Sequence, residues 1–522
     1  MTPADTVTPM PGLSERARNP RVLRLNGDDN LIVSIEPILP GAVAEGVTAI
    51  SRVPKGHKMA TRDIAAGEPV LKFGQIIGFA TKPIRAGEHI HEHNCGVHDF
   101  ARDYRFAEAA QPERVLPEAE RRTFEGFRRK NGRVGTRNYI GIVTSVNCSA
   151  SAARFIADAF NRSGILDDFP HIDGVVAFVQ GGGCGMAGKG SEGYEVLQRT
   201  EWGYANHPNL AGALMVGLGC EVMQIPGLME DYGLKENAMF RTMTIQATGG
   251  TRKTIERGVA MIKEMLPDAN AARRTTVPVS EIMLALQCGG SDGYSGITAN
   301  PALGYAADLL VEQGGTAVLC ETPEIYGAEH LLTRRAATPE IGEKLVGIIK
   351  WWEDYTARNK GEMNNNPSHG NKAGGLTTIL EKSLGAAAKG GTTTLRGVYH
   401  YAEPIDRRGF VFMDSPGLDP VGVTGQVASG CNIIAFTTGR GSAFGFKPAP
   451  SIKLATNSDM YRSMSEDMDI NCGDILDGVT IEAKGREILD EVIAVASGKK
   501  SKSEELGYGD NEFVPWQIGA TM

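Results

Sequence analysis

The sequence predicts an α/β protein in which a small N-terminal β-rich domain is joined by a linker to a large region of parallel-sheet α/β lobes. Three observations predict this class. The 522 residues are too many for one ordinary core. Short β-rich runs fill the chain up to about residue 98. Beyond residue 123, continuous apolar runs of strand length alternate with helical segments, which is typical of a parallel sheet covered on both faces.

The first predicted domain spans residues 22–98 and follows a Pro-rich tail, residues 1–21, that we expect to be disordered. Its β-rich runs, such as NLIVSI from Asn30 and EPVLKFGQIIGFA from Glu68, are separated by Gly-containing turns. No helix of useful length fits between them. Residues 99–122 are charged, contain two Pro and lack periodicity, so we expect a linker there.

The remaining chain contains the apolar runs that we predict to be buried strands. They are NYIGIVTSV, GVVAFVQ, ALMVGLG, EIMLALQ, TAVLCE, GFVFMD, NIIAFTT and PSIKLAT. The segment from Leu266 to Pro278 is polar and Arg-containing, and we predict a loop there. This loop would divide the region into a first α/β lobe, residues 123–270, and a second, residues 271–522.

Composition excludes several classes of function. The net charge is −8 and no dense basic run occurs, so a nucleic-acid partner is not expected. The first 20 residues lack an apolar core, and no run of about 18 apolar residues occurs, so neither secretion nor membrane insertion is expected. Eight Cys without a C-x-x-C pair indicate reduced thiols in the cytoplasm.

Four cysteines follow predicted strands directly: Cys148, Cys184, Cys220 and Cys288. Ligands bind at this carboxyl edge in open α/β sheets, and a following helix N-terminus favours the thiolate. One interpretation is that these thiols are core residues, since Cys is commonly buried. The other is that they bind a soft metal, either iron or an iron–sulfur cluster with an open coordination position.

The loop from Gly183 to Ser191 matches the spacing G-x-x-x-x-G-K, with Lys189 as its lysine. A P-loop needs Ser or Thr directly after this Lys, but Gly190 stands there. A nucleotide-binding function through Lys189 is therefore an alternative, whereas a Gly-rich turn that presents Cys184 fits the residues better.

Histidines alternate near the end of the first domain, at positions 89, 91 and 93. On an extended strand the three imidazoles share one face, which suits a metal but also suits an exposed polar strand end. His57, in the turn Gly56–Lys58, allows the same two interpretations.

Two polar loops in the C-terminal half offer groups for binding an acid. The run from Asn366 to Lys372 carries an amide, an imidazole and an ammonium. Arg440 lies between two glycines after the strand NIIAFTT, where a guanidinium can bind a carboxylate through two hydrogen bonds. A solvated surface loop is the alternative interpretation for both.

Five long motifs follow one another along the chain: Arg133–Asn138, Gly217–Glu221, Gln287–Pro301, Asn366–Gly375 and Thr437–Gly441. Through these motifs the chain resembles the altronate/galactarate dehydratase family, and the first domain, with Gly56–Lys58, resembles the SAF-type domain of these enzymes. The resemblance implies a hydro-lyase of carbohydrate acid catabolism that converts a hexonate or aldarate to a 2-keto-3-deoxy acid, with Fe²⁺ or another divalent metal such as Mn²⁺ or Mg²⁺. The segments His91–Asn94 and Asp99–Asp103 look more like the altronate branch.

These motifs assign roles to the residues above. We predict that Cys148, Cys184, Cys220 and Cys288 bind the metal. Lys372 is the predicted base, made available by burial or a nearby positive charge, with His57 as its competitor. The predicted substrate-binding residues are Ser291, Asp292, Asn371, Thr438 and Arg440.

The predicted partners are a small sugar acid and further copies of the chain, in a homodimer or a higher homo-oligomer. Within the family, a sulfolactate-type C–S lyase is the alternative chemistry. A P-loop protein and a non-catalytic iron–sulfur protein are alternatives of other classes.

Overall fold

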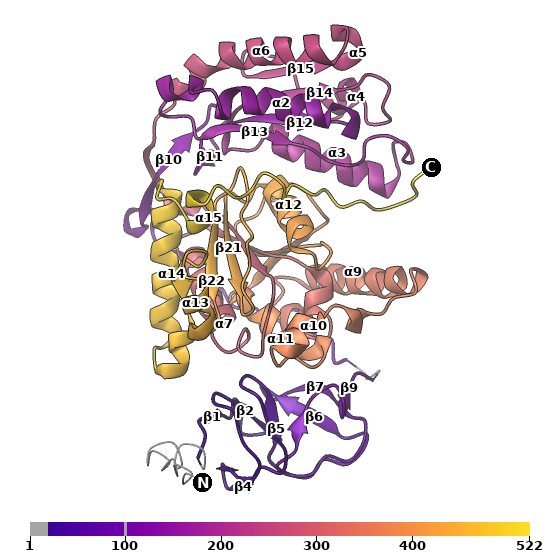
Figure 1. The fold of residues 1–522 in the computed structure, drawn as a ribbon, viewed down its shortest axis with the longest axis vertical. Helices are drawn as coiled ribbons and strands as arrows, with labels where there is room; N and C mark the ends of the chain where they lie inside the picture. The colour runs from indigo at the N-terminus through magenta and orange to yellow at the C-terminus, as the bar shows by residue number, and fades with distance from the viewer. Residues whose placement is uncertain (1–18, 99–101) are drawn as a thin grey trace, which may run out of the picture.

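The computed structural model describes residues 19–98 and 102–522, which form three domains arranged in a row (Figure 1). The predicted tail lies outside the described residues up to position 18, as do residues 99–101 of the predicted linker. A small β domain is followed by two α/β units with parallel sheets, so the predicted fold class is confirmed.

The N-terminal domain is built from short strands without a helix. Its main sheet has the order β1-β2-β5-β8, a second sheet has the order β6-β7-β9, and β3 pairs with β4. The bounds are β1 Val22–Leu23, β2 Leu31–Ser34, β3 Val43–Ala44, β4 Val47–Thr48, β5 Lys58–Ala60, β6 Pro69–Lys72, β7 Gln75–Ala80, β8 His89–Ile90 and β9 Cys95–Gly96.

The second domain has a four-stranded parallel sheet in the order β13-β12-β14-β15. Helices α2 and α6 bury one face, where Ile140, Ile156 and Ile262 share a core, and α3 covers the other. The bounds are β12 Tyr139–Thr144, α2 Ala150–Asn161, β13 Gly174–Phe178, α3 Glu192–Ala205, β14 Leu210–Gly217, α4 Ile225–Asp231, β15 Phe240–Thr244, α5 Ile245–Thr248 and α6 Thr251–Ala271.

The prediction of a loop from Leu266 to Pro278 is wrong. Helix α6 continues through Pro267 to Ala271, because Leu266 and Ala269 lie on its buried face and this packing outweighs the helix-breaking preference of Pro. The following residues form β16 (Thr275–Pro278), which pairs antiparallel with β10 (Thr123–Arg128). A third short strand, β11 (Val134–Gly135), completes this small sheet.

The C-terminal domain has a seven-stranded sheet in the order β19-β20-β18-β17-β21-β22-β23, and all its pairings are parallel. Its helix α12 packs against α3 of the second domain. The strands are β17 Met283–Cys288, β18 Thr316–Leu319, β19 Leu395–Tyr399, β20 Gly409–Met413, β21 Ile433–Thr438, β22 Ser451–Ala455 and β23 Ile470–Asn471. The helices are α7 Ala299–Glu312, α8 His330–Thr333, α9 Pro339–Arg358, α10 His369–Ala373, α11 Ile379–Ala387, α12 Asp419–Ser429, α13 Ser458–Ser463, α14 Ile481–Ala496 and α15 Lys502–Glu505.

The N-terminal domain docks on the C-terminal domain, on the side opposite the second domain (Figure 1). The two share a hydrophobic core, in which Leu31 and Val33 of β2 lie with Tyr294 and Leu384 of the C-terminal domain. The Tyr294 hydroxyl also donates a hydrogen bond of 2.8 Å to the Ser34 carbonyl. These contacts hold the small domain against the loops that follow β17.

A buried ion triad crosses the same interface. Lys58 Nζ lies 2.8 Å from Glu381 Oε2, and Lys72 Nζ lies 2.8 Å from Glu381 Oε1; all three side chains are at most 1% exposed. Burial alone would raise the pKa of Glu381, but Lys58 and Lys72 outweigh it and hold the pKa at about 2. The carboxylate therefore stays ionised at neutral pH and ties α11 to β5 and β6.

We expect this triad to make the fold sensitive to acid. The folded pKa of Glu381 lies below its unfolded value of about 4.3, so its contribution is complete above about pH 4.3 and is lost as the pH falls towards about 2. This shift of the Glu381 pKa corresponds to about 3 kcal/mol of folding free energy. Denaturant unfolding between pH 7 and 2 should show this loss in the wild-type protein and not in Glu381→Gln. The same change of unfolding free energy with pH in the two proteins would contradict this expectation.

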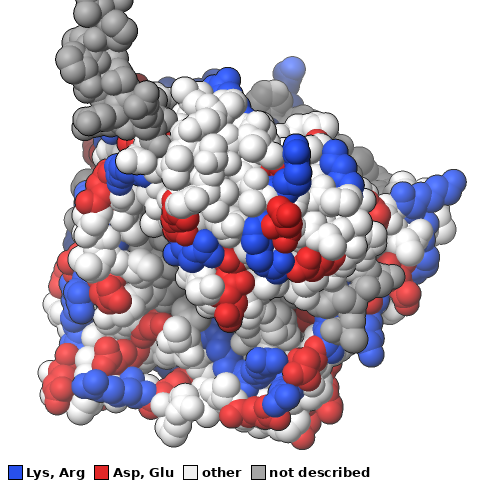
Figure 2. Space-filling view, turned by 90° about the horizontal axis from the view of Figure 1, so that it is seen from below, with Lys and Arg blue, Asp and Glu red and all other residues white. Residues whose placement is uncertain are grey.

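The outer face of the N-terminal domain has a mixed charge. Figure 2 shows Lys and Arg interspersed with Asp and Glu, and the coloured part of this face has no wide area of one sign. Ion pairs at the surface of this domain include Arg62–Glu68 and Arg85–Glu88. Among the described helices, none combines the length and the apolar character that crossing a bilayer requires.

Candidate active site between the N-terminal and C-terminal domains

Three sequence motifs meet where the small domain touches the carboxyl edge of the seven-stranded sheet. They are the Gly56–Lys58 turn, the loop after β17 and the loop after α10. A Cβ atom added at Gly293 would lie 2.1 Å from the Gly56 carbonyl oxygen, and one at Gly375 would lie 2.3 Å from it. These glycines therefore allow two domains, rather than a ligand, to approach closely.

A histidine group occupies this junction. The ligand atoms of His57, His89 and His91 all lie within 4.8 Å of one another, and His57 Nδ1 is 3.0 Å from His89 Nε2. His57 stands before β5, His89 lies in β8, and His91 lies in the turn after β8. The strand that was predicted to align the alternating histidines ends at Ile90, so His91 lies beyond it. The three imidazoles still meet, because His57 lies next to β5, the strand that pairs with β8.

The histidine group fits a divalent metal. Burial, and then the neighbouring His57 and His91, lower the pKa of His89 to about 3, while burial and Lys58 lower the pKa of His91 to about 4, so both imidazoles are neutral at pH 7. Two nitrogens bound at right angles to a metal at about 2.1 Å are about 3.0 Å apart, which matches the distance between His57 and His89.

The C-terminal domain supplies the outer contacts of these ligands. His57 Nε2 lies 3.3 Å from the Ala373 carbonyl oxygen, and His91 Nδ1 lies 3.3 Å from Thr377 Oγ1. Such contacts orient the ring and leave the other nitrogen for a metal. The site is therefore complete only when the two domains are docked.

Lys372 lies beside the histidine group but not in the environment predicted for it. Its ammonium is paired with Glu92 Oε2 at 3.1 Å, and its side chain is 31% exposed. The nearest charge is thus negative rather than positive, and burial is incomplete. Glu92 lies in the same turn as His91, so the pair places Lys372 next to the histidines.

Arg440 is the predicted binding residue with free donors. It follows β21, is exposed, and its guanidinium has no hydrogen-bond or ion-pair partner within residues 19–98 and 102–522. Its Cδ lies near Gly374, since a Cβ added there would be 3.2 Å away. The hydroxyl of Thr438 accepts a hydrogen bond from the Gly441 amide at 3.1 Å, so Thr438 shapes the Arg440 turn.

Two further predicted residues are held in structural hydrogen bonds. Asp292 accepts hydrogen bonds from Thr456, Ser295, Asn457 and the Tyr294 amide, and burial raises its pKa. Asn371 caps α10 and donates to the Ser291 carbonyl at 2.8 Å.

The structure brings Ser291, Asp292, Asn371 and Arg440 to one edge. The Arg440 guanidinium and the Ser291 hydroxyl, for which no partner is found in the described chain, remain available to a substrate.

Cys288 belongs to a second, buried group with Glu321 and Glu324. Its sulfur lies 2.8 Å from Lys389 Nζ and 3.2 Å from Glu324 Oε2, and burial raises its pKa to about 12. Lys382 Nζ lies 2.7 Å from Glu324 Oε1. The ammonium groups of Lys389 and Lys382 thus already balance the negative charge of this buried group. This favours the histidine group as the metal site.

Glu321 is the unusual member of this buried group. Its backbone is left-handed, with φ +70°, and neither carboxylate oxygen has a hydrogen bond. Burial and Glu324 raise its pKa well above the ordinary value. Glu321 lies 3.8 Å from Lys389 Nζ and holds a strained position of the kind that clusters in active sites.

The four predicted metal-binding cysteines do not lie together. Cys148, Cys184 and Cys220 are exposed on the second domain, whereas Cys288 is buried in the C-terminal domain beside the docked N-terminal domain. The two parallel sheets have separate carboxyl edges. Cysteines that follow strands of different sheets therefore do not meet in one site.

The P-loop alternative is not favoured. Lys189 forms an exposed ion pair with Asp231, and Ser191 caps α3 by accepting a hydrogen bond from the Tyr194 amide. Both side chains that a phosphate would need are therefore committed to other contacts.

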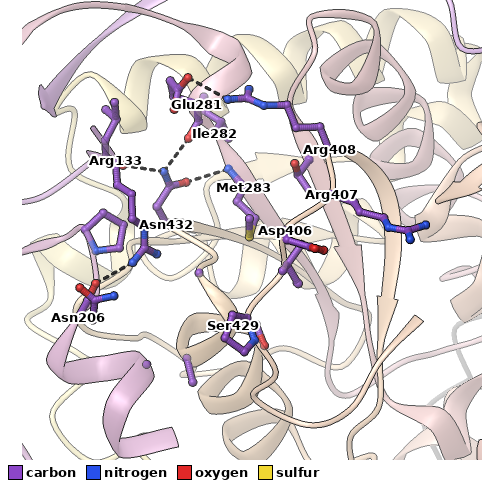
Figure 3. A pocket seen from close by; sticks show the side chains of 18 of the residues that line it. Arg133, Asn206, Glu281, Ile282, Met283, Asp406, Arg407, Arg408, Ser429 and Asn432 are labelled. Carbon is purple, nitrogen blue, oxygen red and sulfur yellow. Dashed lines mark hydrogen bonds and ion pairs between the residues drawn. The ribbon is translucent and has the colours of Figure 1, made fainter. Parts of the chain in front are cut away.

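A cavity of about 400 Å³ lies between the second and C-terminal domains (Figure 3). It opens at Ile282 and Met283, where β17 begins, which is the amino edge of the sheet. Arg133 donates to the Asn206 carbonyl at 2.7 Å, and Arg408 is paired with Glu281. Each of these arginines is held by a contact within its own domain, and the cavity lies at the amino edge, whereas ligands of a parallel sheet bind at the carboxyl edge.

Sequence reasoning missed two parts of the site. The alternating histidines were a usable signal, but their meeting with His57 depends on strand pairing between β5 and β8. The charged residues Lys58, Lys72, Glu381, Lys382 and Lys389 carry no local signal, because such residues are normally solvated.

Comparison with known proteins covers nearly the whole chain. Residues 20–98 match the altronate/galactarate dehydratase SAF domain, residues 126–270 the D-galactarate dehydratase/altronate hydrolase second domain, and residues 279–521 the D-galactarate/altronate dehydratase C-terminal domain. The altronate dehydratase of Bacillus subtilis (strain 168) is 34% identical over 510 residues, which is 96% of this chain and 99% of that protein.

Two other relatives extend the comparison. The galactarate dehydratase (L-threo-forming) of Escherichia coli (strain K12) is 36% identical over 87% of this chain and 88% of that protein. The (2R)-sulfolactate sulfo-lyase subunit beta of Chromohalobacter salexigens is 32% identical over 76% of this chain and 98% of that protein. The chain therefore belongs to the D-galactarate/altronate dehydratase family.

Proposed function

We propose that this chain dehydrates a sugar acid, an altronate-like hexonate or galactarate, to a 2-keto-3-deoxy acid at the junction of its first and third domains. The observation that carries the proposal is the neutral histidine group beside Lys372 and the unpaired Arg440. The similarity to altronate and galactarate dehydratases supports the reaction class. The proposed setting is a reducing cytoplasm, which the eight free cysteines support.

The proposed metal site is His57, His89 and His91. A metal bound there supplies a Lewis acid that stabilises negative charge on the substrate carboxylate and hydroxyl. We propose iron, because imidazole suits Fe²⁺, whereas it suits Mg²⁺ poorly. Ala373 and Thr377 orient His57 and His91.

The remaining steps belong to side chains of the chain. Arg440 binds the carboxylate of the substrate through its free donors. Glu92 holds Lys372 beside the histidines through their ion pair, and the neutral amine form of Lys372 removes the C2 proton. Hydroxide leaves C3 and receives that proton from Lys372, so that water departs and the enol tautomerises to the keto acid. His57, with both ring nitrogens engaged, is less available as the base.

We expect Lys372→Met to lower kcat for 2-keto acid release by about 10²- to 10⁴-fold, since a positioned base contributes that much. The assay is a panel of hexonates, pentonates and aldarates with ferrous iron, together with sulfolactate. Lys82→Met, which removes an exposed lysine of the N-terminal domain, should keep the wild-type rate. A near-normal rate in folded Lys372→Met would transfer the role to His57, and release of sulfite alone would replace the dehydratase proposal.

A further inference from the structure

Three exposed cysteines distinguish the second domain from the rest of the chain. The other five cysteines are buried, which is the usual state of this residue. Cys148 follows β12, Cys184 follows β13, and Cys220 follows β14, and these strands are neighbours in one parallel sheet. The exposed thiols are therefore confined to one edge of one sheet.

Hydrogen bonds join the three loops that carry these thiols. The Asn147 amide donates to the Gly182 carbonyl at 3.1 Å, and the Val222 amide donates to the Gly183 carbonyl at 2.9 Å. The Ser145 hydroxyl donates to Glu221 Oε1 at 2.7 Å. Each contact lies within three residues of two of the cysteines, so the loops form one connected surface.

The Cys184 loop is also held from the third domain. The Met522 amide donates to the Gly185 carbonyl at 2.8 Å, and Met186 pairs with Thr521. Gly183, with φ +88°, lies so close to Ser145 that an added Cβ would be 2.0 Å from its carbonyl oxygen. The backbone on both sides of Cys184 is therefore fixed against neighbouring segments.

The environment of the thiols suits metal-bound thiolates. The twelve-residue helix α2 begins two residues after Cys148, so Cys148 lies at the positive end of this helix. Gln246 Nε2 donates to Cys220 Sγ at 3.4 Å, the kind of hydrogen bond that tunes cluster sulfurs. Beside Cys148 lies a cavity of about 300 Å³, lined by Asn147, Arg154 and Gln180 among others.

The spacing does not suit a single ion bound by all three thiolates. The three sulfurs are not among the described groups whose ligand atoms all lie within 4.8 Å of one another. Thiolates around one tetrahedral ion, each at about 2.3 Å, would be closer together than that. In a cluster, by contrast, each thiolate binds a different iron, so the sulfurs are farther apart.

We propose that Cys148, Cys184 and Cys220 hold a [4Fe–4S] cluster in the second domain, separate from the histidine site. The three thiolates bind three irons, and the fourth iron faces a ligand other than cysteine, because the described second domain has no fourth cysteine. The proposal does not depend on the sugar-acid reaction, and its readouts below are independent of turnover.

The test is anaerobic reconstitution of the full-length protein with ferrous iron and sulfide. We expect about four irons and four sulfides per chain in addition to histidine-bound metal, with visible charge-transfer absorbance. Cys148→Ser, Cys184→Ser and Cys220→Ser should each lose the sulfide and the absorbance. Cys288→Ser and His89→Ala should retain both.

A second measurement avoids variants that fail to fold. In metal-free wild-type protein, iodoacetamide should label Cys148, Cys184 and Cys220, and reconstitution should protect all three in a mass-spectrometric map. The proposal is overturned by reconstituted protein without sulfide, by labelling that reconstitution leaves unchanged, or by equal loss of sulfide in Cys288→Ser, which would restore a four-cysteine site.

Discussion

His89→Ala should lower sugar-acid dehydration by more than about 100-fold and reduce the metal bound at the N-terminal domain. Its Nε2 lies 3.0 Å from His57 Nδ1, and it is flanked by His91, so its loss removes one of three converging donors. Changes to outer contacts of metal ligands already cost about 10- to 100-fold, and loss of a ligand should cost more. Metal analysis of the dialysed variant, beside the rate, checks both parts.

Two variants provide controls for the histidine site. His93→Ala removes an exposed histidine of the same turn that is outside the metal-binding group, and it should keep the wild-type rate. Thr377→Val removes the hydroxyl 3.3 Å from His91 Nδ1 and should have an intermediate effect of about 10- to 100-fold. Unchanged metal content and rate in His89→Ala would remove the histidine group from the active site.

Glu381→Gln should destabilise the docked protein by about 3–5 kcal/mol. The substitution leaves the ammonium groups of Lys58 and Lys72 buried without a counter-charge, which is the costly way to break a buried ion pair. The N-terminal domain should then separate from the C-terminal domain. Denaturant unfolding and limited proteolysis of the segment between residues 102 and 122 would measure the two effects.

Two further variants distinguish the loss of the buried triad from the removal of a charge in general. Glu68→Gln breaks the solvent-exposed pair with Arg62 and should change stability by less than about 1 kcal/mol. Replacing Lys58 and Lys72 by Met together with Glu381 by Leu should recover most of the lost stability, because apolar residues tolerate burial. Wild-type stability in Glu381→Gln would show that the triad does not hold the domains together.

The strands were predictable because their signal is local. A strand buried on both faces must be continuously apolar, and each of the predicted runs from residue 123 onward contains an observed strand. Strands β15, β19 and β23 were missed, since FRTMT, LRGVY and IN are not continuous apolar runs. The polar residues of β16 concealed another strand, which is exposed at its first two positions.

The sequence by itself determined the fold class, the family and the placement of thiols and polar loops after buried strands. These properties depend on residue patterns within a few positions. Only the tertiary structure decided that the two parallel sheets have separate carboxyl edges, so that Cys288 lies apart from Cys148, Cys184 and Cys220. It also decided that His57 meets His89 and His91, because β5 pairs with β8. Such contacts join residues far apart in the chain, and domain docking, rather than local propensity, selects them.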